Sequence, residues 1–241
     1  MISIRPHSFF PKGFILNPNN VNSSLNQSMS YNSNDVSFCG SFFGSLKQNF
    51  LQINRMNHHC NEFTRIQRES KKIFELGLQF YEGKRYKKDH EKAFQYFLLA
   101  ANKGNVEAQF SVGIFYYCGL GMNHPNKYKS FNYFKMAANK NHPKAQYCYA
   151  MCLAKGEGIR TNLPKAIRYF RLSAENGYDE GQYCYGRCLF NGFEIKQDFK
   201  QASILFKKSL DQGNPKAEFF YDLCSNPSVN ANKYKSCYKI A

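Results

Sequence analysis

The residues of this chain that could bind a metal or activate a nucleophile are few and scattered. The densest group is His58-His59-Cys60, three adjacent residues that carry nitrogen and sulfur donors. A structural zinc site needs about four such ligands, and no second pair follows at the spacing of a zinc finger. We therefore interpret this group as polar residues of a flexible segment, and we expect the protein to use no cofactor and no metal.

Two pairs of cysteines form a second candidate. Cys148 and Cys152 are four residues apart, and so are Cys184 and Cys188. If each pair lay on one of two neighbouring helices, the four sulfurs could supply a thiolate site. Cysteine as a small buried apolar residue is the favoured interpretation, because Phe115 takes the corresponding place one unit earlier.

Two Gly-x-Gly sequences, at residues 119–121 and 156–158, have the spacing of a phosphate-binding loop. Such a loop follows a strand, whereas both of these follow a predicted helix, so we interpret them as turns between helices. No histidine is placed to act as a base for a nucleophile, because His90, His124 and His142 all fall at predicted turns. We expect no enzymatic activity.

The composition is that of a folded and strongly basic protein. The chain has 241 residues, with 33 Lys+Arg against 17 Asp+Glu, a net charge of +16 and 43% hydrophobic residues. A wholly disordered chain is excluded, and no apolar run approaches the roughly 20 residues that cross a bilayer. We expect reduced thiols and a cytoplasmic location, although the serine-rich, acid-free residues 1–34 partly resemble an organelle transit peptide.

Composition also divides the chain into three parts. Residues 1–66 contain an Asn/Ser-rich tract and are expected to form a largely disordered arm. Residues 67–224 carry a regular pattern, and residues 225–241 form a basic C-terminal tail. We expect the middle part to hold the fold.

The middle part repeats itself at steps of 36 or 37 residues. The aligned segments are ELGLQFYEG (75–83), SVGIFYYCG (111–119), YAMCLAKG (149–156) and YGRCLFNG (185–192). Between them an aromatic residue recurs, followed by small residues, at Phe97, Phe134, Phe170 and Phe206. A period of this length is typical of a stacked array of small structural units.

Each unit is predicted to form two helices. In the third unit Ala145, Tyr149 and Leu153 recur at helical spacing, as expected for a buried face. Small residues mark where two helix backbones approach most closely, at Gly77, Gly113, Ala150 and Gly186. Helix ends are marked by Asp89 and Asp198 as N-caps and by Gly104, Asn141, Gly177 and Gly213 as left-handed C-terminal residues. The sequence therefore predicts an all-α solenoid of stacked antiparallel helical hairpins, with about four and a half repeats in a right-handed superhelix.

The repeated pattern is Ala-x3-Leu-Gly-x2-Tyr-x2-Gly, followed by Lys-Ala, an aromatic residue, Ala-Ala and Gly. It resembles the Sel-one-like repeat of the tetratricopeptide-like superfamily over residues 70–224, including the first helix of a fifth unit, Ala217 to Cys224. The resemblance implies an adaptor or scaffold in signalling or protein quality-control assemblies. One secreted branch of this family joins the two helices of each repeat by a disulfide, and that branch is disfavoured because the second helices here contain no cysteine.

In arrays of this kind the first helices line the concave face, where aromatic and apolar residues recur at equivalent positions. One position holds Phe74, Phe110, Tyr147, Tyr183 and Phe219; the next holds Leu78, Ile114, Met151, Arg187 and Leu223; a third holds Tyr81, Tyr117, Ala154 and Phe190. The first position fits a groove or the core between repeats equally well, whereas the other two favour a groove. We predict that the groove contains Phe110, Ile114, Tyr117, Tyr147, Met151, Tyr183, Arg187 and Phe190.

We expect a protein partner, bound as an extended peptide or a helix whose apolar anchors fill pockets while nearby cations select its acidic residues. One alternative is RNA or single-stranded DNA on the basic, aromatic-lined surface. Another is a non-catalytic arm of a larger complex, with self-association through the unpaired last helix.

Overall fold

The computed structural model describes residues 36–192 and 194–225, and every regular element among them is an α-helix. The helices are α1 (Val36–Glu82), α2 (His90–Asn102), α3 (Val106–Cys118), α4 (Lys127–Ala138), α5 (Pro143–Lys155), α6 (Leu163–Glu175), α7 (Asp179–Asn191), α8 (Phe199–Asp211) and α9 (Lys216–Ser225). The chain divides into two compact units, one that ends at His59 and one that begins at Cys60.

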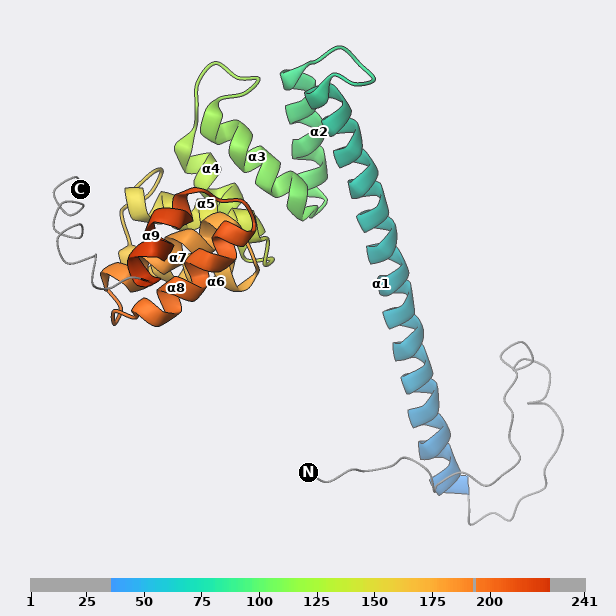
Figure 1. Ribbon diagram of the computed structural model, residues 1–241. Coiled ribbons are helices and arrows are strands. Elements are labelled where there is room, and N and C mark those ends of the chain that lie inside the picture. The colour runs from blue at the N-terminus through green and yellow to red at the C-terminus, as the bar shows by residue number, and fades with distance from the viewer. Residues whose placement is uncertain (1–35, 193, 226–241) are drawn as a thin grey trace. The chain divides into compact units, whose positions relative to one another are not determined.

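In the unit that begins at Cys60, consecutive helices pack as hairpins (Figure 1). Helix α3 packs against α4, α5 against α6, and α7 against α8. Each hairpin packs against the next through the contacts of α4 with α5, α6 with α7 and α8 with α9. The predicted all-α solenoid of stacked helical hairpins is confirmed.

The ends of the helices follow the chemistry of the repeated sequence. The carboxylate of Asp89 accepts a hydrogen bond from the backbone N–H of Lys92 at 2.9 Å, and Asp198 caps α8 in the same way. At the other end, Asn141 and Gly177 follow α4 and α6 with φ angles of 62° and 83°, in the left-handed region. Both kinds of helix boundary were predicted and are confirmed.

The core of each hairpin is built around one phenylalanine of the second helix. Phe97, Phe134, Phe170 and Phe206 are all buried. A Cβ atom at Gly113 would lie 2.6 Å from two ring carbons of Phe134, and one at Gly77 would lie 2.7 Å from the ring of Phe97. In both hairpins the phenylalanine ring therefore contacts the glycine backbone directly, which confirms the predicted close approach. This contact explains why glycine is tolerated in the middle of these helices.

A hydrogen bond fixes the same contact in the second hairpin. The hydroxyl of Ser130 on α4 is fully buried and donates to the carbonyl oxygen of Gly113 on α3 at 2.8 Å. Ser130 lies one turn before Phe134, so the hydrogen bond and the ring contact hold neighbouring turns of the two helices together.

The N-terminal region differs from the expectation. Residues 36–66, predicted to belong to a disordered arm, are helical and form the first part of α1. Beyond the Asn/Ser-rich tract, apolar residues recur at helical spacing, as in Leu46, Phe50 and Ile53, and this pattern sustains a helix. Residues 1–35 of the predicted arm and residues 226–241 of the predicted tail lie outside the described residues.

The contact between Gly113 and Phe134 predicts a penalty for adding one methyl group. We expect Gly113→Ala to lower the free energy of unfolding by about 1–2 kcal/mol, because overpacking outweighs the gain in helix propensity. Urea denaturation followed by circular dichroism measures it. The control is Lys135→Ala on an exposed position of α4, which should leave the midpoint unchanged. Equal stability of the wild type and Gly113→Ala would show that the Phe134 ring moves aside at no cost in free energy, and it would contradict the prediction.

Candidate functional site

The first helices of the hairpins share one side of the stack. Helix α5 contacts α7 directly, and α7 contacts α9, in addition to their contacts with the second helices. Direct contact between alternate helices places them on the shorter, inner side of the curve. We call the surface of α1 from Cys60, α3, α5, α7 and α9 the first-helix side, and that of α2, α4, α6 and α8 the second-helix side.

The first predicted groove position holds half-buried rings that join consecutive repeats. The ring centroid of Phe110 lies 5.9 Å from that of Phe134 in its own hairpin and 4.6 Å from that of His142 at the start of the next. The ring of Tyr147 lies 6.1 Å from that of Phe170 and 5.5 Å from that of Tyr178.

Tyr183 repeats this arrangement in the fourth hairpin, with its ring 6.2 Å from that of Phe206 and 5.9 Å from that of Phe220. Of the two interpretations left open for this position, the geometry favours the core between repeats. These three rings therefore connect consecutive repeats, and because they are half-buried only part of each ring is exposed to a partner.

The second groove position brings two predicted residues to one hollow. Met151 on α5 and Arg187 on α7 line a hollow of about 300 Å³ together with Lys155, and Phe170 of α6 also lines it. Arg187 is exposed, and its guanidinium lies 5.8 Å from the ring centroid of Tyr183. We call this the α5–α7 hollow. Ile114, the equivalent residue on α3, is half-buried and packs against the core.

The residues at the third groove position differ in how deeply they are buried. Phe190 is only 4% exposed, and its ring packs against those of Phe199, Phe206 and Phe220. The prediction of Phe190 as a groove residue is therefore corrected: its side chain extends into the space between α8 and α9. It is a core residue.

Tyr117 is held by charged neighbours. The ammonium group of Lys127 lies 3.0 Å from the centroid of its ring. A hydrogen bond with Glu157 raises the pKa of Tyr117 to about 12. Its phenol therefore stays protonated at physiological pH and links α3 to the turn after α5.

A second hollow on the first-helix side was not foreseen from the sequence. It measures about 560 Å³, and Phe74 and Leu78 of α1 line it together with Arg68, Lys71 and Glu107. Residues 64–71 precede the first recognisable landmark of the repeat, so the repeat pattern did not draw attention to them. The available signal was the helical spacing of Thr64, Gln67 and Lys71 with Phe74.

His142, which the sequence places at a turn, has a structural role. It is the N-cap of α5, where its Nδ1 atom accepts a hydrogen bond from the backbone N–H of Ala145 at 3.0 Å. The Nε2 atom therefore carries the hydrogen and donates it to the Glu107 carboxylate, 3.1 Å away. Because the ring is buried and both nitrogens are engaged, His142 ties α3 to α5.

The four clustered cysteines are free thiols packed against the core of the third hairpin. Burial raises the pKa of Cys148 and Cys184 to about 12, and that of Cys152 and Cys188 to about 11. Within residues 36–192 and 194–225, no group of three or more His, Cys, Asp and Glu side chains is arranged to hold a metal ion. The cluster has the properties of apolar packing.

The two Gly-x-Gly sequences lie in the turns that follow α3 and α5. A Cβ atom at Gly121 would lie 2.8 Å from the carbonyl oxygen of His90, and one at Gly158 would overlap the carbonyl of Lys127. Each turn thus packs backbone against backbone on the start of the preceding second helix. The interpretation as helix-connecting turns is confirmed. The His58-His59-Cys60 group lies exposed on α1.

Stacked antiparallel hairpins with a continuous inner side define a helical-repeat protein of the tetratricopeptide-like class. Residues 73–105, 106–142, 143–178 and 179–214 each match the Sel1 repeat, so the chain belongs to the Sel1 repeat family. Proteins of this family generally act as protein-interaction scaffolds and are typically non-catalytic.

The solved structures that match this chain include other repeat proteins. A Sel1 repeat protein from Oxalobacter formigenes is 26% identical with a TM-score of 0.58, over 63% of this chain and 62% of that one. A protective antigen of uropathogenic Escherichia coli with an SLR fold is 22% identical, with a TM-score of 0.43 over 66% and 42% of the two chains. Cysteine rich protein B of Helicobacter pylori is 24% identical, with a TM-score of 0.43 over 56% and 96%.

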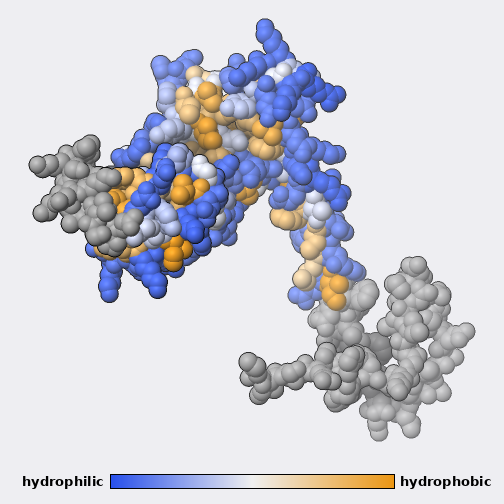
Figure 2. All heavy atoms as spheres, in the orientation of Figure 1, coloured by the Kyte–Doolittle hydropathy of each residue, from blue (hydrophilic) through white to orange (hydrophobic). Residues whose placement is uncertain are grey.

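No curated protein is significantly similar to the chain. Among the described helices, none combines the length and the apolar character that crossing a lipid bilayer requires. On the face that Figure 2 shows, most residues are hydrophilic and the hydrophobic ones gather in separate patches.

The raised thiol pKa values predict slow and uneven alkylation. At pH 8 we expect iodoacetamide to modify the exposed Cys60 and Cys118 at least tenfold faster than Cys148 or Cys184, because only the thiolate reacts. Residue-resolved mass spectrometry over time measures the rates, with the urea-unfolded protein as control. Since folding raises these pKa values, the rate at the buried thiols should still be rising above pH 9. Equal rates at all sites would contradict the burial of the cluster.

Proposed function

We propose that the chain is a non-catalytic binding module that holds a peptide or helix of a partner protein on its first-helix side, centred on the α5–α7 hollow. The observation that carries the proposal is that Met151 and Arg187, on different helices, line the same hollow. An apolar floor beside an exposed cation is the arrangement that anchors an apolar side chain and reads a charge next to it.

The charges around the hollow indicate the chemistry of the partner. Lys155 and Arg187 line it and no acidic residue does. A segment that bears Asp or Glu beside an apolar anchor is therefore attracted to this hollow. The wider hollow near Phe74 is lined by two cations and two carboxylates, so it adds no net charge but offers an extended ligand a second contact on another repeat.

A charge reversal at the hollow tests the proposal. Linear dodecapeptides selected from a phage library on the full chain should combine apolar and acidic residues. Fluorescence anisotropy should then show at least tenfold weaker binding to Arg187→Glu, about 1.4 kcal/mol, because a favourable contact becomes repulsive. The matched control is Lys207→Glu, the same charge change on an exposed position of α8.

Two results would contradict the proposal. One is equal weakening by Arg187→Glu and Lys207→Glu, which would show that only net charge matters. The other is tight, salt-sensitive retention of a single-stranded RNA 20-mer with no enrichment of peptides, which would favour the nucleic-acid alternative.

A further inference from the structure

The position immediately before the core phenylalanine differs in one hairpin. The first three second helices carry a tyrosine there, Tyr96, Tyr133 and Tyr169, and α8 carries Leu205. Each tyrosine packs on an aromatic ring of the first helix in its own hairpin. The centroid distances are 5.4 Å for Tyr96 to Phe80, 5.7 Å for Tyr133 to Tyr116 and 4.6 Å for Tyr169 to Tyr149.

The third hairpin shows how such a tyrosine is received. The ring of Tyr169 stands edge-on to Tyr149, with an angle of 83° between their planes. Its hydroxyl donates a hydrogen bond to the side-chain oxygen of Asn139 at 3.1 Å, at the end of α4. Tyr169 therefore fills a notch on the second-helix side, between the end of one hairpin and the body of the next.

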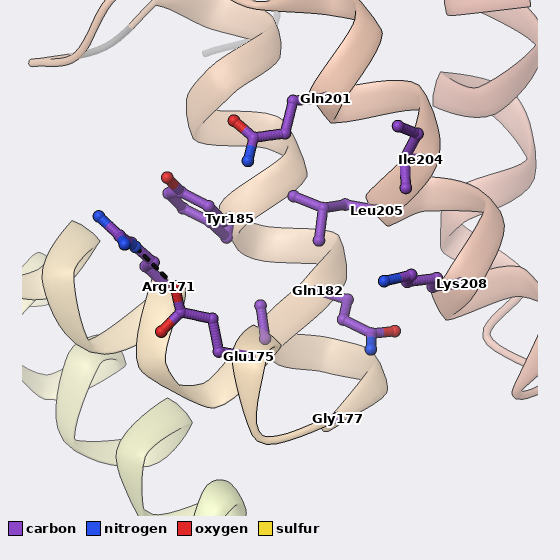
Figure 3. Close-up of a pocket in the computed structure, with 10 residues that line it drawn as sticks. Arg171, Glu175, Gly177, Gln182, Tyr185, Gln201, Ile204, Leu205 and Lys208 are labelled. Carbon is purple, nitrogen blue, oxygen red and sulfur yellow. Dashed lines mark hydrogen bonds and ion pairs between the residues drawn. The ribbon is translucent and has the colours of Figure 1, made fainter. Parts of the chain in front are cut away.

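The same notch one repeat later lacks a tyrosine. The residues 36 positions beyond Tyr149, Asn139 and Tyr169 are Tyr185, Glu175 and Leu205. All three line a hollow of about 590 Å³ between α6, α7 and α8, which we call the α6–α8 notch (Figure 3). The ring and the hydrogen-bond acceptor that receive Tyr169 thus have counterparts here, while the shorter leucine leaves the space open.

The walls of the notch are suited to a phenol ring. Half-buried Leu205 and half-exposed Ile204 supply apolar surface, and Tyr185 supplies a ring for edge-on packing. Glu175 pairs through Oε1 with Arg171 at 2.8 Å, which fixes the carboxylate and leaves Oε2 to accept from a hydroxyl. Lys208 stands at the other wall, so both rims carry a cation.

We propose that the α6–α8 notch binds a tyrosine side chain of a partner protein, in the place that Tyr169 takes in the preceding repeat. The ring packs against Tyr185, and the hydroxyl donates to Glu175. Arg171 and Lys208 favour an acidic residue next to that tyrosine. This surface lies on the second-helix side and is independent of the groove proposed on the first-helix side.

Three capped tripeptides serve as probes: acetyl-Asp-Tyr-Gly-amide and its phenylalanine and alanine counterparts. In NMR titrations of the full chain we expect the tyrosine peptide to bind with a dissociation constant on the order of 1 mM, the affinity that one buried ring supports. The phenylalanine peptide should bind at least threefold more weakly, because it has no hydroxyl for Glu175, and the alanine peptide should not bind detectably.

The decisive variant fills the notch with a tyrosine of the chain itself. Leu205→Tyr restores the residue of the other three hairpins and should weaken the tyrosine peptide at least tenfold while raising the melting temperature. Lys207→Tyr is the matched control, since it adds the same ring at an exposed position of α8 that does not line the notch and should leave binding unchanged. Arg187→Glu should also leave it unchanged, which separates this proposal from the first-helix groove.

Three outcomes would overturn the inference. The first is equal binding of the tyrosine and alanine peptides, and the second is full binding to Leu205→Tyr. The third concerns the chain's own tyrosines beyond residue 225, Tyr234 and Tyr238. If replacing both by serine strengthened peptide binding more than tenfold, the notch would be occupied by this chain itself and not by a partner.

Discussion

The structure depends on one contact, the ring of a second-helix phenylalanine pressed onto first-helix backbone that has little or no side chain. At Gly113 and Phe134 the fit leaves no room for a methyl group, and the buried hydroxyl of Ser130 holds the next turn. Because the contact fixes the distance between the two helices, it sets the geometry of the hairpin, and its recurrence every 36 or 37 residues makes successive hairpins stack alike.

In a regular repeat, a residue that differs from its equivalents in the other units marks a place where that unit has a surface of its own. Equivalent positions have equivalent surroundings, so a single exchange changes one place in a known environment. Arg187 stands where the preceding repeat has Met151, and it brings a cation to an otherwise apolar position. Leu205 stands where the preceding repeat has Tyr169, and it opens a notch whose acceptor and ring remain. Both departures fall in the fourth hairpin, Arg187 on α7 and Leu205 on α8.

Of the eight predicted groove residues, two line one hollow, and two of the differences from the prediction have clear physical reasons. Met151 and Arg187 were found because helical periodicity places them one above the other on neighbouring first helices. Phe190 was assigned to the groove by the same rule, but the last turn of α7 faces Phe220 of α9, and a ring large enough to reach it becomes buried. The helical residues before 67 were missed because they precede the first repeat landmark.

The sequence by itself determined the helices, their caps, the repeat and the points of closest approach, because each of these rests on contacts between residues of one repeat unit. Tertiary structure alone decided which equivalent residues remain accessible and which pairs meet across repeats. The hydrogen bonds from His142 to Glu107 and from Tyr169 to Asn139 are examples. Whether a side chain is accessible depends on how completely the side chains of three or four neighbouring helices fill the space around it. The periodic pattern of the sequence does not give that packing.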